Sequence, residues 1–156
     1  MHWKEIALTD DLTGLWNYRA FHKLYTKEIA RARRHKYPLT LVFIDLNKFK
    51  VYNDTLGHIK GDNLLKRVSK VIIKQLREYD NVFRLGGDEF ILLLPHTNKS
   101  EAREIMERIN QKLKNNPKIS ISYGIAIYPV DTKSKTKLIE LADQKMYKDK
   151  KRKALK

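Results

Sequence analysis

The run LTLVFIDL at residues 39–46 restricts the fold of this chain more than any other stretch. It is rich in strand-forming residues and reads as a buried β-strand. Further strand patterns follow it, and segments with apolar residues at helical spacing lie before, between and after them. The expected strands are 39–46, 81–85, 89–94 and 118–128. The expected helices are about 17–36, 47–54, 62–78, 100–113 and 134–150.

From the first strand onward, the order of elements is β-α-β-β-α-β, which is typical of an α+β, ferredoxin-like fold. Right-handed crossovers place the strand at 89–94 between those at 39–46 and 81–85, antiparallel to both. We therefore expect an antiparallel central sheet flanked by helices.

Local signals predict where several elements begin and end. Asn17 can cap the first helix, and Pro38 stops it. Gly57 and Gly61 predict a break before the second long helix. Ser100 is expected to cap the helix that it begins, without the glutamate of a capping box.

The predicted topology brings acidic residues together at one edge of the sheet. Asp45 ends its strand beside Asp88 and Glu89, which begin another. Converging carboxylates repel one another unless they share a proton or bind a cation. With no His or Cys next to them, the donors are all oxygen, which suits Mg²⁺ or Mn²⁺ rather than zinc.

Residues around these acids suit a phosphate ligand. Gly86 and Gly87 allow a tight turn and close approach of a phosphate, and Lys50 can supply positive charge to a polyphosphate. The alternative is that GGDE is only a hairpin turn and Asp45 a helix cap. Spacing and topology alone leave both interpretations open.

Asn53 and Asp62 offer an amide and a carboxylate between the two acidic segments. The pairing edge of guanine presents two N–H donors and one carbonyl acceptor, so this pair can read it. Adenine would leave polar groups unpaired, which costs about 1–3 kcal/mol. Taken alone, cap and turn roles explain both residues equally well.

Composition narrows the classes of protein. At 156 residues the chain has the length of a single domain. It contains no cysteine and no apolar run long enough to span a bilayer. Its formal net charge of +15 favours phosphate-bearing ligands and leaves a nucleic-acid-binding palm domain as one hypothesis. The absence of an aromatic-basic stripe argues against nucleic acid.

Several motifs in one order resemble those of the GGDEF domain, the catalytic domain of diguanylate cyclases. They are DLTGLWNYRAF (11–21), FIDLNKFKVYNDTLGHIKGDNLL (43–65), RLGGDEF (84–90) and ADQKMYKDK (142–150). The resemblance implies a palm-like sheet and condensation of two GTP into cyclic di-GMP with release of two pyrophosphates. It also implies two Mg²⁺ or Mn²⁺ ions per active site and a homodimer with one GTP per subunit.

The resemblance also implies roles for individual residues. Asp45, Asp88 and the Leu46 carbonyl would bind metal. The catalytic residues would be Asp88, the adjacent acid Glu89, and Lys50. Asn53 and Asp62 would contact guanine. The phosphate contacts would come from four residues: Lys50, Gly86, Gly87 and Lys150.

The sequence departs from the family pattern at a few positions. Asn47 stands where an Asp is common, and Tyr18 where an Arg is common; we expect both to be tolerated. Ala154 takes the position of a second phosphate-binding Arg, for which Arg152 or Lys153 can substitute.

Arg77 and Asp80 form an R-x-x-D pair before the second strand. By itself the pair reads as helix-end charge followed by a turn. In the family this spacing marks an inhibitory site for cyclic di-GMP, with Arg108 as a further contact. Because a strand separates it from the acidic tip, such a site would act allosterically.

The sequence therefore predicts a product-inhibited diguanylate cyclase domain at 11–156, preceded by an N-terminal segment at 1–10. The alternative is a catalytically silent module that senses cyclic di-GMP. We further expect a sensory or dimerising domain N-terminal to this region, a cytoplasmic location, and neither nucleic acid nor membrane as a partner of this chain.

Overall fold

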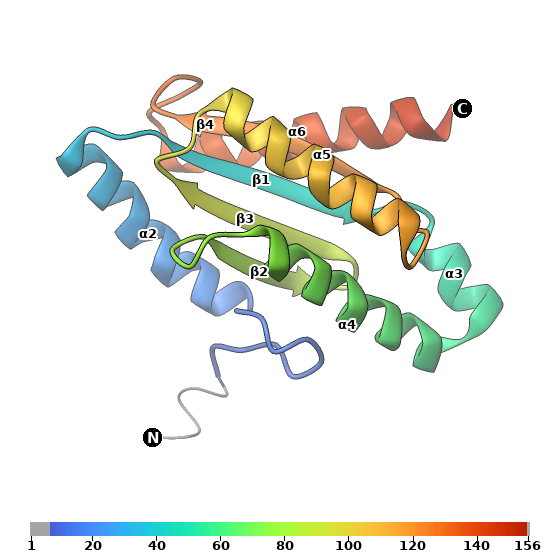
Figure 1. The fold of residues 1–156 in the computed structure, drawn as a ribbon. Coiled ribbons are helices and arrows are strands. Elements are labelled where there is room, and N and C mark those ends of the chain that lie inside the picture. The colour runs from blue at the N-terminus through green and yellow to red at the C-terminus, as the bar shows by residue number, and fades with distance from the viewer. Residues whose placement is uncertain (1–6, 156) are drawn as a thin grey trace.

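A four-stranded antiparallel sheet lies at the centre of the computed structural model, which describes residues 7–155 (Figure 1). Its strand order is β2-β3-β1-β4. The strands are β1 (Leu39–Leu46), β2 (Asn81–Gly86), β3 (Glu89–Pro95) and β4 (Ile121–Tyr128). The helices are α2 (Tyr18–His35), α3 (Phe49–Leu56), α4 (His58–Gln75), α5 (Lys99–Asn115) and α6 (Lys135–Ala154). The predicted α+β, ferredoxin-like fold is confirmed.

Helices cover both faces of the sheet, so the central strands are buried on both sides (Figure 1). α4 and α5 pack with Val42 and Ile44 of β1, whereas α2 and α6 pack with Leu41 and Phe43. Every residue of β1 is buried. This two-sided burial explains why β1 reads as a continuous apolar run instead of an alternating one.

Two predicted boundaries around the second long helix were wrong. We expected a break at Gly57 and Gly61 and a helix over 62–78, but α4 begins at His58 and ends at Gln75. Gly57 is the junction between α3 and α4, with φ of 92°, a backbone conformation that favours glycine. Gly61 lies inside α4 for a packing reason given below.

The N-terminus of α5 also differs from expectation. Asn98 caps it instead of Ser100, and the capping box is complete: Asn98 accepts from the Glu101 amide at 2.9 Å, and Glu101 accepts from the Asn98 amide at 3.1 Å. The predicted lack of a box glutamate was therefore wrong. Asn17 does cap α2, as predicted, by accepting from the Ala20 amide.

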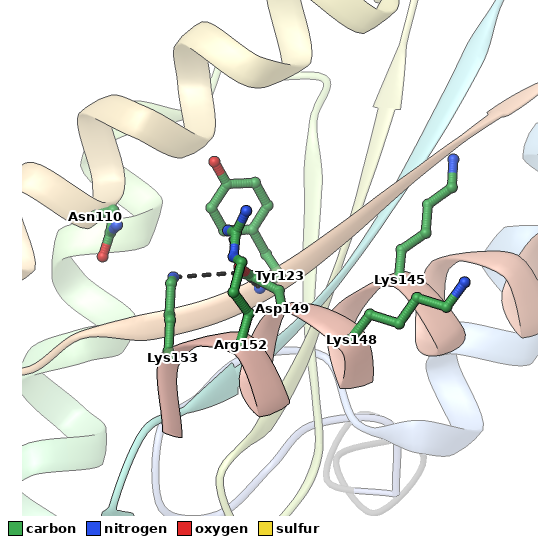
Figure 2. Close-up of a pocket in the computed structure, with 7 residues that line it drawn as sticks. All are labelled: Asn110, Tyr123, Lys145, Lys148, Asp149, Arg152 and Lys153. Carbon is green, nitrogen blue, oxygen red and sulfur yellow. Dashed lines mark hydrogen bonds and ion pairs between the residues drawn. The ribbon is translucent and has the colours of Figure 1, made fainter. Parts of the chain in front are cut away.

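Charged side chains cover the outer edge of β4, which pairs only with β1. They bond the backbone groups that point away from the sheet, which is one way in which edge strands avoid pairing with other chains. The pairs are Lys153 with the Ile121 carbonyl, Asp149 with the Tyr123 amide (3.0 Å), Lys145 with the Ile125 carbonyl (3.0 Å) and Asp131 with the Ile127 amide (2.8 Å). Figure 2 shows the part of α6 that runs beside this edge.

Within residues 7–155, the helices are too short or too polar for any of them to cross a membrane. The first six residues of the predicted N-terminal segment, 1–6, lie outside the described part of the chain.

Candidate active site

The end of β1 that carries Asp45 and the β2–β3 turn that carries Asp88 lie at the end of the sheet near α3, as the topology predicted (Figure 1). Asp45 is paired in register with Glu89 across β1 and β3. The Leu46 amide donates to the Asp88 carbonyl at 3.3 Å, which fixes the end of β1 against the β2–β3 turn. Asp45 thus lies at the same end of the sheet as Asp88 and Glu89, which are far from it in sequence.

Crowding raises the pKa of two of these acids. Burial, followed by the influence of the neighbouring Asp45 carboxylate, raises the pKa of Asp88 to about 7. Burial and the charges of Asp45 and Asp143 raise the pKa of Glu89. Such a cluster holds a proton near neutral pH or takes a cation in its place.

Lys150 of α6 reaches the same cluster. Its Nζ donates to Asp45 Oδ2 at 2.6 Å. Burial alone would lower the pKa of Lys150, but the hydrogen bond to Asp45 and the nearby carboxylates raise it. The other oxygen, Asp45 Oδ1, is buried and has no hydrogen-bond partner. Lys150 therefore neutralises only half of the Asp45 carboxylate.

The donors at this edge fit a hard divalent cation. Asp45 offers a free buried oxygen and Asp88 a second carboxylate, and Leu46 directly follows Asp45 and bonds the Asp88 carbonyl through its amide. Residues 7–155 contain no group of three or more His, Cys, Asp or Glu side chains placed to hold a metal. A cation here would complete its shell with water or substrate phosphates, which is how Mg²⁺ usually binds.

Asn53 and Asp62, the predicted guanine contacts, come from neighbouring helices that pack together. Asn53 of α3 lies against Gly61 of α4, so closely that a Cβ on Gly61 would be 1.6 Å from Asn53 Oδ1. Gly61 thus leaves the space that the Asn53 side chain occupies, and Asn53 lies beside the residue that precedes the exposed Asp62. Asn53 Oδ1 is also buried without a hydrogen-bond partner.

The two buried oxygens without a hydrogen-bond partner both lie in predicted ligand-binding residues. Among the described residues, Asp45 Oδ1 and Asn53 Oδ1 are the buried side-chain polar atoms that lack a partner. Such atoms normally find partners because leaving one unpaired costs about 1–3 kcal/mol. Both belong to residues that the sequence predicted to bind ligand.

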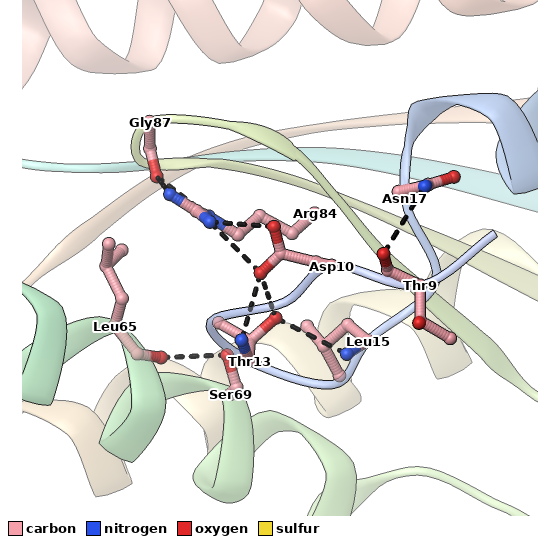
Figure 3. Close-up of polar contacts among 9 residues, drawn as sticks. All are labelled: Thr9, Asp10, Thr13, Leu15, Asn17, Leu65, Ser69, Arg84 and Gly87. Carbon is pink, nitrogen blue, oxygen red and sulfur yellow. Dashed lines mark hydrogen bonds and ion pairs between the residues drawn. The ribbon is translucent and has the colours of Figure 1, made fainter. Parts of the chain in front are cut away.

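The glycine turn is held by a pair that sequence reasoning missed, shown in Figure 3. Arg84 donates to the Gly87 carbonyl through Nε at 3.1 Å and Nη2 at 3.0 Å. Its Nη1 contacts both oxygens of Asp10, at 2.9 and 3.0 Å. Gly86 and Gly87 have φ of 145° and 52°, so the turn uses backbone that favours glycine.

Asp10 is itself anchored before α2 begins. Its carboxylate accepts from the Thr13 amide at 3.0 Å and from the Thr13 hydroxyl at 2.7 Å. Burial opposes ionisation, but the bonds from Thr13 and Arg84 lower the pKa of Asp10. The signal in the sequence was an acid just before DLTG and an arginine just before LGG. The predicted domain boundary between 10 and 11 stays a prediction.

The predicted phosphate-binding residues are not all brought together. Lys150 reaches the acids, whereas Lys50 is exposed on α3, and no hydrogen bond or ion pair joins it to them in the described structure. Arg152 and Lys153, the possible substitutes at the tail, both contact Asp149, as Figure 2 shows for Lys153. Ala154 is exposed at the end of α6.

Asn47 has a structural role that explains an amide at this position. Its Nδ2 donates to Ser120 Oγ at 2.9 Å, and its Oδ1 accepts from Ser122 Oγ at 2.6 Å. An amide provides a donor and an acceptor, whereas an ionised Asp provides only acceptors. Asn47 thus joins the end of β1 to the start of β4.

The R-x-x-D pair is a compact network. Arg77 Nε and the Arg77 amide both donate to Asp80 Oδ2, and Nη2 donates to Oδ1 at 3.0 Å. Nη2 also donates to the Pro95 carbonyl and to Thr97 Oγ1. Arg108 bonds the side chain and carbonyl of Gln75, two residues before Arg77, and no hydrogen bond among the described residues joins it to the pair. The structure thus joins Arg77 and Asp80 but not Arg108.

Comparison with known proteins agrees with the sequence motifs. A family model described as "Diguanylate cyclase, GGDEF domain" matches residues 7–156. Diguanylate cyclase DosC from Escherichia coli K12 is 36% identical over 147 residues, covering 88% of this chain and 32% of DosC. Cyclic di-GMP phosphodiesterase NbdA from Pseudomonas aeruginosa is 35% identical over 154 residues, covering 94% of this chain and 20% of NbdA.

A solved structure has the same fold. The GGDEF domain of DgcB from Caulobacter crescentus, in complex with c-di-GMP, superposes with a TM-score of 0.88 at 28% identity. The match covers 93% of this chain and 91% of that one. The chain thus spans nearly all of a solved domain, but only about a third of the length of DosC.

Proposed function

The chain belongs to the GGDEF domain family, and from that premise we propose that it is the catalytic domain of a diguanylate cyclase. Two GTP molecules would condense to cyclic di-GMP and release two pyrophosphates. One observation carries the proposal beyond family membership: the two orphaned buried oxygens, Asp45 Oδ1 and Asn53 Oδ1, lie at the predicted metal and base contacts.

Asp45, Asp88 and the Leu46 carbonyl would hold the divalent cations, two per active site. Bound Mg²⁺ or Mn²⁺ supplies positive charge that stabilises the developing charge on the phosphates. The raised pKa of Asp88 supports this assignment, because a carboxylate that is crowded by another gains most from a nearby cation. Glu89, which also has a raised pKa, would support the site as the adjacent acid.

Asn53 and Asp62 would select guanine, and Lys150 would bind the triphosphate together with Lys50 and the Gly86–Gly87 turn. The free Oδ1 of Asn53 can accept from a guanine N–H, and the exposed Asp62 carboxylate can accept from another. Lys150 would exchange part of its contact with Asp45 for phosphate oxygens.

The chemistry requires two copies of the domain. In each of two successive steps, the 3′-hydroxyl of one GTP attacks the α-phosphate of the other. An O3′–P bond forms, the bond to pyrophosphate breaks, and the hydroxyl proton is released. Because each domain would hold one GTP, the two acidic edges must face each other in a homodimer.

Product inhibition would act through Arg77 and Asp80. The Arg77–Asp80 network lies at the start of β2, whereas the acids lie at its far end, so the product would not compete with GTP. Cyclic di-GMP bound here, with Arg108 as a further contact, would hold domains apart and shift the population away from the productive dimer.

A silent cyclic di-GMP sensor is the second candidate. The similarity to a protein named as a phosphodiesterase favours it, since a GGDEF-like segment there is part of a protein named for a different activity. Against it stands the complete Gly-Gly-Asp-Glu-Phe sequence at residues 86–90. The longer relatives support a sensory or dimerising domain elsewhere in the full protein, and we expect a cytoplasmic location where GTP is available.

The direct test is incubation of the purified dimeric chain with GTP and Mg²⁺, followed by mass identification of the product. Cyclic di-GMP is expected from wild type and none from Asp88→Ala. ATP should give no cyclic product. If the dimer yields no product with Mg²⁺ or Mn²⁺, the cyclase proposal is wrong.

A titration with cyclic di-GMP separates the two candidates. A product-inhibited cyclase should slow as product is added, and Arg77→Ala should remain active and uninhibited. A silent sensor should bind cyclic di-GMP by calorimetry, lose that binding in Arg77→Ala, and show no turnover in either form.

A further inference from the structure

A large cavity, here called the distal cavity, lies at the end of the sheet opposite the acids. It has a volume of about 1060 Å³ and is bounded by the end of α2, the start of α5 and the loop after β4. Figure 1 shows these segments gathered at the end of the sheet away from α3. At this end Leu39 pairs with Tyr128, whereas Asp45 lies about 20 Å further along β1 at about 3.3 Å per residue.

The cavity has an aromatic and aliphatic floor. Tyr37 and Tyr128 line it and are 9% and 6% exposed, so little of either ring is left for solvent. The Tyr37 ring stacks on His96 with centroids 3.8 Å apart, which holds it in position. Val130, which also lines the cavity, is 78% exposed and gives it an apolar rim on one side.

Around that floor stand four cations: Arg33, Lys36, Lys99 and Lys133. All four are exposed, and none of them forms an ion pair with another described residue.

The single acid of the lining does not offset these charges. Asp131 accepts from the Ile127 amide at 2.8 Å and pairs with Lys145 at 3.9 Å. The two helix ends at the cavity, the C-terminus of α2 and the N-terminus of α5, have opposite dipole polarity. Side-chain charge therefore decides the sign of the field, and it is positive.

We propose that the distal cavity binds a small amphipathic anion, with a flat apolar body and a carboxylate, sulfonate or phosphate group. The volume matches sites that hold drug-sized ligands, and an apolar floor with a few polar groups around it is their usual composition. The body would lie against the exposed Pro129 and Val130 and the small exposed parts of Tyr37 and Tyr128, and the anionic group would meet the unpaired cations at the rim. The site is independent of the proposed cyclase activity.

The probe for the test is 1-anilinonaphthalene-8-sulfonate, a fluorescent aromatic anion, with neutral N-phenyl-1-naphthylamine as its uncharged counterpart. Lys99→Glu/Lys133→Glu removes two rim cations. Lys66→Glu/Lys70→Glu on the exposed face of α4 is the control, because two Lys→Glu exchanges lower the formal net charge of +15 by four in either variant. Urea unfolding of each variant establishes that it is folded.

We expect saturable binding of the sulfonate to wild type, about tenfold weaker in the rim variant and within about twofold of wild type in the control. The neutral probe should bind less tightly than the sulfonate and not respond to the rim variant. Equal weakening in both variants would show only a long-range field and overturn the proposal. Displacement of the dye by hexaglutamate at equal concentration would also overturn it, because charge alone would then suffice.

Discussion

Two buried carboxylates in this molecule each pair with a cation, but only one of them has hydrogen-bond partners for both of its oxygens. Asp80 and Asp45 are both buried residues, and their side chains are 0% and 10% exposed. Both oxygens of Asp80 accept hydrogen bonds from Arg77, which is itself bonded to Pro95 and Thr97. Asp45 meets Lys150 through one oxygen, and the other has no partner.

The difference separates a network whose hydrogen bonds are complete without a ligand from one that leaves a buried oxygen free to meet a ligand. A buried pair with all its bonds made holds the fold, and removing one partner strands the other. A buried carboxylate with a free oxygen lowers stability, and such a cost is retained where a ligand later provides the missing partner. We therefore expect mutations at the two pairs to affect different measurements.

The largest effect is expected on activity, at Asp45. Asp45→Asn should lower the rate of cyclic di-GMP formation about a thousandfold, equivalent to about 4 kcal/mol, because a cation loses one of its two carboxylates. The free energy of unfolding in metal-free buffer should stay within about 0.5 kcal/mol, since the amide relieves crowding with Asp88. A large loss of stability in urea would show that Asp45, like Asp80, holds the fold, and would contradict this prediction.

The next effect is expected on stability, at Asp80. Asp80→Ala should lower the free energy of unfolding by about 2–3 kcal/mol, less than for a fully buried pair because water reaches the Arg77 side chain, which is 36% exposed. Asp80→Asn keeps one acceptor for Arg77 and should lose about half as much. Equilibrium urea unfolding measures both. A loss below 0.5 kcal/mol for Asp80→Ala, on the order of a surface pair, would mean that the network is not structural.

A substitution at Gly61 tests the role of the second oxygen without a hydrogen-bond partner, Asn53 Oδ1. Gly61→Ala would place a methyl group where Asn53 Oδ1 now lies, and should raise the KM for GTP about tenfold, or about 1.4 kcal/mol. Stability should hold or rise, because Ala favours a helix over Gly by up to about 1 kcal/mol. In an Asn53→Ala background the same exchange should leave KM unchanged. Additive effects in steady-state kinetics would show that Gly61 does not act through Asn53.

The smallest effect is expected on stability, at the ion pair of Asp10 and Arg84. Both oxygens of this carboxylate have hydrogen-bond partners, unlike those of Asp45. Because the folded state lowers the pKa of Asp10, its stabilisation is present above the ordinary pKa of Asp and is lost as pH falls through the folded value. Asp10→Asn should cost about 1 kcal/mol at pH 7 and less at acid pH. Urea unfolding at pH 7 and pH 3 measures the difference, and an equal cost at both would contradict the ionic contribution.

Sequence alone predicted the fold because its signals are local. The apolar run of β1 has the observed bounds, and the order of elements was enough to bring Asp45 beside Glu89. Where patterns conflict, the prediction failed: Gly61 reads as a helix break, yet α4 continues through it, and the glycine leaves room for the Asn53 side chain.

The contacts that complete the site could not be predicted from the sequence, for a different reason. Arg84 and Asp10 are 74 residues apart, and each looks like an ordinary surface charge until the backbone brings them together. Lys150 was expected to contact phosphate, but its bond to Asp45 depends on the angle at which α6 crosses the sheet. Side-chain geometry of this kind follows from packing, which a pattern of residue types does not encode.

The charged side chains along β4 also bear on how the protein is made. During synthesis β4 leaves the ribosome before α6, so Lys145, Asp149 and Lys153 arrive after the strand that they protect. Until then the β4 edge of the sheet has unpaired backbone N–H and C=O groups, which are open to pairing with a neighbouring chain. Folding of α6 onto β4 thus protects the sheet from aggregation. A chain whose synthesis stops before α6 would keep the edge exposed and would be prone to aggregate.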